Sequence, residues 1–148
     1  MNTQVDNICV DLDGTLVNTD TLVESILLFI KQNPVNILKC IAWLWLGKAR
    51  FKDKIASEVQ LNVQTLPYNT KLLVYLQQEC INKKIHLCTA ANHSIAAPIA
   101  KHLGIFSSVF ASSADRNLKG VKKAEVLVNE FGEKGFVYAG EIGLWESL

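Results

Sequence analysis

The chain has 148 residues, which is enough for one domain with a sizeable core and too few for two full domains. Its 15 basic and 14 acidic residues leave a net charge of +1, which argues against a nucleic-acid-binding surface and against strong overall attraction to anionic lipid. Any charge effect must therefore be local. Residues 1–7 are polar and contain no lysine or arginine, so they predict neither a secretory signal nor a transit peptide, and we expect a cytoplasmic protein.

The most informative stretch comes early, where the apolar residues 8–10 lead directly into Asp11-Leu12-Asp13-Gly14-Thr15. This pattern is typical of a buried parallel strand that meets its loop, the place where open α/β sheets bind ligands. Side chains alternate along a strand, so Asp11 and Asp13 can face one pocket. One carboxylate can then act as a nucleophile while the other transfers protons. The alternative interpretation is an ordinary Asp-Gly turn after a strand.

Residues 18–65 are predicted to be helical, with no convincing strand among them. Thr19, Asp20 or Thr21 can cap a first helix that runs to about residue 32. The second helix, residues 35–46, is the most apolar part of the chain, and a third covers about 51–59. The second helix is too short to cross a bilayer, which requires roughly 20 apolar residues. Three interpretations remain for it: a core helix of a small cap, a subunit contact, or a helix on a membrane surface or against a membrane protein.

After residue 66 the pattern alternates between helices and strands. We expect helices at 70–81, 94–104 and 121–131, and strands at 85–89, 109–112 and 135–141. In the last of these helices, Val121, Ala124 and Leu127 are predicted to face inward. The four cysteines, Cys9, Cys40, Cys80 and Cys88, show no Cys-x-x-Cys spacing and are predicted to be small buried residues rather than disulfide or zinc ligands. The alternation indicates an α/β fold with a parallel sheet and right-handed crossovers.

Polar residues recur at equivalent places, at the carboxyl end of a strand or the amino end of the next helix. They are Asp11 with Asp13, Thr89, Lys119 and Glu141. Carboxylates, a hydroxyl and an ammonium group together suit a phosphate and a hard cation. Taken singly, Thr89 could be an ordinary strand-ending threonine and Lys119 a solvated lysine. Lys122 or Lys123 could replace Lys119 if the helix register differs.

The string Asp-Leu-Asp-Gly-Thr-Leu and the three later positions resemble the four motifs of the haloacid dehalogenase-like (HAD) hydrolases. The resemblance implies a Rossmannoid three-layer α/β fold with a parallel sheet and a small helical cap after the first strand. It also implies a magnesium-dependent phosphatase that acts through an aspartyl-phosphate. By this resemblance Asp11 is the nucleophile, and Asp13 protonates the leaving oxygen and then activates water. Thr89 binds a phosphoryl oxygen, and Lys119 neutralises its charge.

The resemblance further assigns substrate binding to Leu12, Gly14, Thr15 and Ala90, and Mg²⁺ binding to Asp11, Asp13 and Glu141. The fourth motif departs from the family, because Glu141 and Glu146 stand where two aspartates are usual. Glutamate is longer, and Mg²⁺ tolerates distorted geometry poorly. The alternative function is therefore a weak or inactive HAD-like module that binds a phosphate ligand or a membrane or protein partner.

The implied domain organisation is an HAD-like core formed by residues 1–17 and 66–148, with a helical cap at 18–65. Asn33-Pro34, Leu66-Pro67-Tyr68-Asn69 and Asn117-Leu118-Lys119-Gly120 also resemble the HAD domain found ahead of UbiA-type prenyltransferase domains. The expected ligand is a small phosphorylated substrate, with no nucleic acid and no transmembrane segment. Residues 37–46, with Trp43 and Trp45, are the candidates for self-association or a membrane-side contact.

Overall fold

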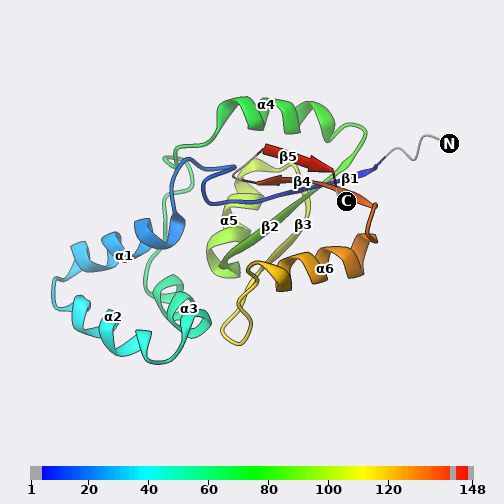
Figure 1. The fold of residues 1–148 in the computed structure, drawn as a ribbon. Coiled ribbons are helices and arrows are strands. Elements are labelled where there is room, and N and C mark those ends of the chain that lie inside the picture. Colours follow the sequence, from blue (N-terminus) through cyan, green and yellow to red (C-terminus); the bar gives the residue numbers. More distant parts are fainter. Residues whose placement is uncertain (1–4, 141–142, 147–148) are drawn as a thin grey trace.

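The structure is a computed structural model that describes residues 5–140 and 143–146 (Figure 1). Five strands and six helices follow one another along the chain: β1 (Asn7–Val10), α1 (Thr21–Gln32), α2 (Asn36–Leu44), α3 (Lys48–Glu58), α4 (Thr70–Glu79), β2 (Lys84–Asn92), α5 (His93–Leu103), β3 (Phe106–Ser112), α6 (Val121–Phe131), β4 (Phe136–Gly140) and β5 (Gly143–Glu146). The predicted α/β class with an inserted helical segment is confirmed.

The sheet has the strand order β3-β2-β1-β4-β5. Its first four strands are parallel, so the carboxyl ends of β1, β2 and β4 lie at one edge. β1 is central, because Val10 pairs with Leu87 on one side and with Ala139 on the other. β5 runs antiparallel to β4 and was not expected from the sequence.

Helices cover both faces of the sheet, which gives three layers (Figure 1). On one face Ile8 and Val10 pack into the main core with residues of α4 and α5, such as Leu76 and Ile99. On the other face Cys9 packs with Leu127 of α6. Alternate residues of β1 thus enter opposite cores, as the alternation of side chains along a strand requires.

Several expected boundaries differ from those observed. β2 continues past Thr89 to Asn92, because Asn92 pairs with Ser112 of β3 after an irregularity in the register. α3 begins at Lys48 rather than near residue 51, directly after Gly47, whose φ of 91° suits glycine. The predicted inward positions of Val121 and Ala124 are wrong, since Val121 is 74% exposed and Ala124 is exposed too, whereas Leu127 is buried as predicted.

Helices α1, α2 and α3 lie together at one side of the sheet (Figure 1). They enclose a small core of their own, in which Phe29 stacks on Trp43 with ring centroids 5.5 Å apart and Phe51 and Ile55 are buried. The chain leaves and re-enters the main body at adjacent points, because the Asn18 amide donates to the Pro67 carbonyl at 2.8 Å. We call α1–α3 the helical cap.

Cys9, Cys40 and Cys88 are buried as predicted, whereas Cys80 is half-buried. None of the helices within 5–140 has the length and apolar character needed to span a bilayer.

Candidate active site

Asp11 and Asp13 follow the central strand and face the same hollow. The Asp11 amide donates to the Ala139 carbonyl at 2.9 Å, which ties the start of the loop to β4. A cavity of about 230 Å³ opens beside the loop. Its lining consists of Asp11, Asp13, Asp20, Leu22, Lys52, Ala90, Ala91 and Lys119. The structure therefore brings together two carboxylates from the first motif, the end of β2 and two lysines.

Asp11 is held by two contacts, and both are made by its Oδ1 atom within the described residues. The Leu12 amide donates to Oδ1 at 2.9 Å, and Lys123 Nζ lies 3.2 Å from it in an ion pair. The two side chains of this pair are only 21% and 11% exposed, so the pair is largely shielded from water. The other carboxylate oxygen, Oδ2, is thus left available for a ligand.

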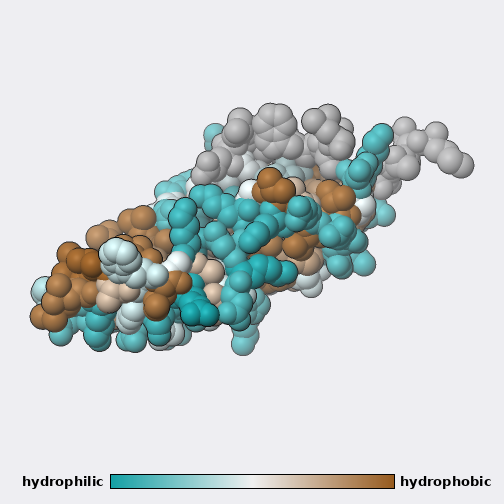
Figure 2. Space-filling view, turned by 60° about the horizontal axis from the view of Figure 1, so that its bottom comes forward, coloured by the Kyte–Doolittle hydropathy of each residue, from teal (hydrophilic) through white to brown (hydrophobic). Residues whose placement is uncertain are grey.

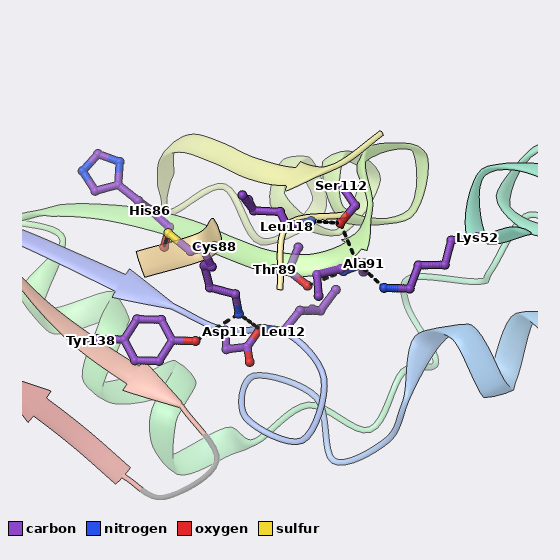
Figure 3. A network of polar contacts seen from close by, with 12 residues as sticks. Asp11, Leu12, Lys52, His86, Cys88, Thr89, Ala91, Ser112, Leu118 and Tyr138 are labelled. Carbon is purple, nitrogen blue, oxygen red and sulfur yellow. Dashed lines mark hydrogen bonds and ion pairs between the residues drawn. The ribbon is translucent and has the colours of Figure 1, made fainter. Parts of the chain in front are cut away.

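Lys123, on the first turn of α6, is the lysine that pairs with Asp11. Its Nζ also donates to the Tyr138 hydroxyl at 3.1 Å (Figure 3). Burial lowers the pKa of Lys123, but the charges of Asp11 and Tyr138 and the contacts with both side chains together outweigh burial, so this pKa is raised. Burial, with a smaller effect of Asp11, raises the pKa of Tyr138. Lys119 lines the cavity but is exposed, and the ion pair with Asp11 belongs to Lys123.

Asp13 is fixed by the start of the cap. Its Oδ1 accepts a hydrogen bond from the Thr21 amide at 2.8 Å, at the amino end of α1. Burial raises the pKa of Asp13, although the bond from Thr21 works in the opposite direction. A carboxyl group that holds its proton more readily than usual is suited to act as an acid.

Thr89 and Ala90 lie within β2 rather than at its carboxyl end. Thr89 is fully buried, and its hydroxyl accepts a hydrogen bond from the Ala91 amide at 3.0 Å. The Ala90 carbonyl accepts from Ser112 Oγ at 2.8 Å, and Ser112 Oγ in turn accepts from the Leu118 amide (Figure 3). Ser112 therefore joins β2, β3 and the approach to α6, a role that the sequence did not indicate.

Lys52 was also missed by the sequence analysis, because it belongs to the cap. Its Nζ donates to the Ala90 carbonyl at 2.9 Å and to Asn117 Oδ1 at 3.0 Å. Burial, and then the positive charge of Lys119, lower its pKa. The sequence did indicate that Lys52 faces inward, because its spacing places it on the same helical stripe as the buried residues Ile55 and Val59. A charged residue in an apolar stripe requires a polar partner.

The other predicted binding residues lie in the loop but not in the cavity lining. Leu12 is fully buried, and its amide donates a hydrogen bond to Asp11 Oδ1. The amides of Gly14 and Thr15 donate to the carbonyls of Thr19 and Leu12. Gly14 has a φ of 71°, which explains why glycine follows the second aspartate. Of the four predicted binding residues, Ala90 alone contributes to the described cavity.

The carboxylates of Asp11 and Asp13 suit Mg²⁺, which is commonly bound by one or two carboxylates together with water and a substrate phosphate. No cluster of three metal-binding side chains forms among the described residues. Glu141, the third predicted ligand, lies outside the described residues.

Comparison with known proteins adds the following. No family model matches the chain. The uncharacterized protein y4nM of Sinorhizobium fredii (strain NBRC 101917 / NGR234) is 34% identical over 142 residues. That match covers 93% of this chain and 27% of y4nM, so the chain spans about a quarter of the length of the curated relative that it matches.

Two solved structures share the fold. The HAD family hydrolase t0658 from Salmonella enterica serovar Typhi matches with a TM-score of 0.62 at 9% identity, over 89% of this chain and 54% of that one. A protein with unknown function from Bordetella pertussis Tohama I matches with a TM-score of 0.56 at 12% identity, over 91% of this chain and 81% of that one. The chain therefore has the HAD-like α/β fold.

Proposed function

We propose that the chain is a magnesium-dependent phosphoric monoester hydrolase that acts through an aspartyl-phosphate on a small phosphorylated substrate in the cytoplasm. One observation carries the proposal. Asp11 and Asp13 line one cavity with Lys52 and Lys119, while Lys123 holds Asp11 by an ion pair at 3.2 Å. Carboxylates and ammonium groups around one cavity supply a nucleophile, a proton donor and compensation for phosphoryl charge.

In the proposed reaction, Asp11 Oδ2 attacks phosphorus, because Oδ1 is already engaged by Leu12 and Lys123. The bond between phosphorus and the ester oxygen breaks, and Asp13 donates a proton to that oxygen as it leaves. Water then attacks the acyl phosphate, and Asp13 takes a proton from it. Inorganic phosphate leaves, and both carboxyl groups return to their starting states.

Within this proposal, Lys123 orients Asp11, and Lys52 with Lys119 compensates the charge of the phosphoryl group. Thr89 fixes the backbone of residues 89–91 through its bond to the Ala91 amide, so that Ala90 is presented to the phosphate. Mg²⁺, when bound, would supply positive charge at the phosphoryl oxygens. Asp11 and Asp13 are the residues that would hold it, with Glu141 as the third proposed ligand.

We also propose that residues 18–65 form a cap domain on a core made of residues 1–17 and 66–148. The pairing of Val17 with Tyr68, next to the bond between Asn18 and Pro67, supports this division. The motif layout supports a domain of the kind found ahead of UbiA-type prenyltransferases. The greater length of y4nM is compatible with a domain that serves within a larger protein.

Hydrolysis of an aryl phosphate, measured with and without Mg²⁺, tests the proposal. Wild type should release phosphate only with the metal, and Asp11→Asn should abolish both turnover and the phosphorylated enzyme seen by mass spectrometry. Asp115→Asn is the matched control, because Asp115 is exposed and lies outside the cavity lining. Near-normal hydrolysis by a folded Asp11→Asn protein would contradict the mechanism. Phosphate binding without turnover in wild type would favour the non-catalytic alternative.

A further inference from the structure

The outer face of α2 carries an apolar surface that the fold of the cap does not use. The inward stripe of this helix, Asn36, Cys40 and Trp43, packs against the cap core. The outward side chains remain in solvent, with Trp45 88% and Leu38 64% exposed. The segment therefore packs in the cap through one face and leaves Trp45 exposed on the other.

The exposed apolar side chains of this region belong to α2, to the residues that flank it and to one position of α1. They are Leu27, Val35, Ile37, Leu38, Ile41, Leu44, Trp45 and Leu46, which we call the α2 surface. Figure 2 shows hydrophobic residues gathered at the end of the molecule formed by the cap, with hydrophilic residues beside them. Exposed apolar patches of this kind mark contacts with proteins or membranes.

Charge decides between these classes of partner. Between Glu24 and Asp53 the chain contains five charged residues, and all of them are basic: Lys31, Lys39, Lys48, Arg50 and Lys52. The first four are exposed, and Lys39 and Lys48 lie within or next to α2 in the sequence, whereas Lys52 turns to the cavity. This local excess stands against a net charge of only +1 for the whole chain. An apolar surface in a segment whose charged residues are all basic complements an anionic layer with an apolar interior.

We propose that the α2 surface binds an anionic lipid membrane. Helices that lie in a membrane interface insert Trp, Leu and Ile below the headgroups and place Lys and Arg against anionic lipid. Trp45 suits the headgroup level, because its ring is largely apolar and its N–H can stay hydrated. The contact is peripheral and holds the cap against the lipid surface. It is independent of whether the chain hydrolyses phosphate esters.

Co-sedimentation with vesicles tests the apolar part of this proposal. Wild type should sediment with vesicles that contain phosphatidylglycerol and remain in solution with vesicles of phosphatidylcholine alone. The double variant Leu38→Gln/Trp45→Gln should bind the anionic vesicles at least roughly ten-fold more weakly, because two apolar side chains no longer leave water. The control Val74→Gln/Ile81→Gln replaces two exposed apolar residues in and just after α4, which are 53% and 80% exposed, and should bind as wild type does.

A second pair of variants tests the charge. Lys39→Gln/Lys48→Gln should weaken binding to anionic vesicles and reduce its dependence on salt, since both lysines lie within or next to α2 in the sequence. The control Lys71→Gln/Lys101→Gln removes two positive charges from exposed positions on α4 and α5, outside the cap. It should leave vesicle binding and its salt dependence unchanged. Unchanged thermal unfolding of the variants establishes that the fold is intact.

The proposal would be overturned if wild type failed to bind anionic vesicles. It would also be overturned if the test and control variants lost vesicle binding to the same extent. Sedimentation velocity in the absence of lipid provides a further check, for which we expect a monomer. A concentration-dependent dimer that Leu38→Gln/Trp45→Gln dissociates would show that a second copy of the chain occupies the surface instead.

Discussion

At the scale of single residues, the lysine beside Asp11 decides how the proposed site works. The sequence placed Lys119 at the amino end of the last helix, but the structure pairs Asp11 with Lys123. A lysine that orients the nucleophile and compensates charge has a larger effect on the rate than one exposed at the edge of the cavity.

We therefore expect Lys123→Gln to lower kcat/KM for an aryl phosphate by about 10²–10³-fold. Lys119→Gln should reduce it only a few-fold and mainly through KM. Steady-state kinetics of the two variants decide between the lysines, with thermal unfolding as the check on folding. A larger loss in Lys119→Gln would return the catalytic role to Lys119 and leave Lys123 as a structural ion pair.

His86 gives the fold a dependence on pH. It is buried under α6, and its ring Nε2 lies 3.1 Å from Asn7 Oδ1 while Nδ1 contacts Ser108 Oγ. The amide group of Asn7 donates to the Gly135 carbonyl, so its oxygen is left to accept from Nε2. Burial, and then the nearby charge of Lys84, lower the pKa of His86 below its ordinary 6.5, although Glu130 acts in the opposite direction.

The unfolded chain therefore takes up a proton at a higher pH than the folded chain does. The contribution of His86 to stability is complete above the unfolded pKa and falls as the pH decreases toward the folded pKa. Urea unfolding between pH ~7.5 and ~5.5 should show a loss of unfolding free energy that is smaller in His86→Asn. His93→Asn, at an exposed histidine, should keep the wild-type pH dependence. An identical slope in His86→Asn and wild type would exclude His86 as the source.

At the scale of elements, α3 joins the cap to the core. Lys52 reaches Ala90 and Asn117, and the neighbouring Asp53 accepts a hydrogen bond from Asn92 Nδ2 at 3.0 Å. These contacts are polar, whereas Ala56 of the same helix packs into the main apolar core, and Lys52 lines the proposed site. The polar contacts can be exchanged for contacts with an anionic substrate.

Replacing Lys52 by methionine should raise KM for an aryl phosphate by about ten-fold, because a charged hydrogen bond contributes about 1.5–3 kcal/mol. The value of kcat should change less, since the proposed reacting groups lie on the core. Lys54→Met, at an exposed lysine of the same helix, is the control. An unchanged KM in Lys52→Met would restrict Lys52 to holding the cap in place.

At the scale of the whole molecule, the sheet assembles the site from segments that are far apart along the chain. The carboxyl ends of β1, β2 and β4 meet at one edge, and the fourth motif continues from β4. Glu141, the third proposed Mg²⁺ ligand, follows β4 in the sequence. Its side chain extends about 1.5 Å further than that of aspartate, which is large beside Mg²⁺–oxygen distances of about 2.0–2.1 Å.

Glu141→Asp is therefore expected to tighten Mg²⁺ binding and to increase phosphatase turnover, whereas Glu141→Ala should weaken both. Magnesium titration of wild type and the two variants, followed by hydrolysis and by calorimetry, measures the effect. Equal Mg²⁺ affinity in all three proteins would place Glu141 outside the metal shell and favour a non-catalytic phosphate-binding module.

The sequence alone determined the α/β class, the inserted helices and the loop that contains Asp11 and Asp13, because these follow from local patterns. Apolar periodicity separates strands from helices, and the Asp-Leu-Asp-Gly string combines a strand end with a required glycine turn. Of the three candidates Thr19, Asp20 and Thr21 for the cap of the first helix, the structure confirms Asp20.

The tertiary structure alone decided which side chains share the site. The partners of Lys52 lie 38 and 65 residues away along the chain, and no local pattern specifies such contacts. The rotation of α6 about its axis, set by Leu127 packing under the sheet, turned Lys123 toward Asp11 and left Val121 in solvent. Likewise, the apolar residues of α2 were visible in the sequence, but only the packing of the cap showed which of them remain exposed.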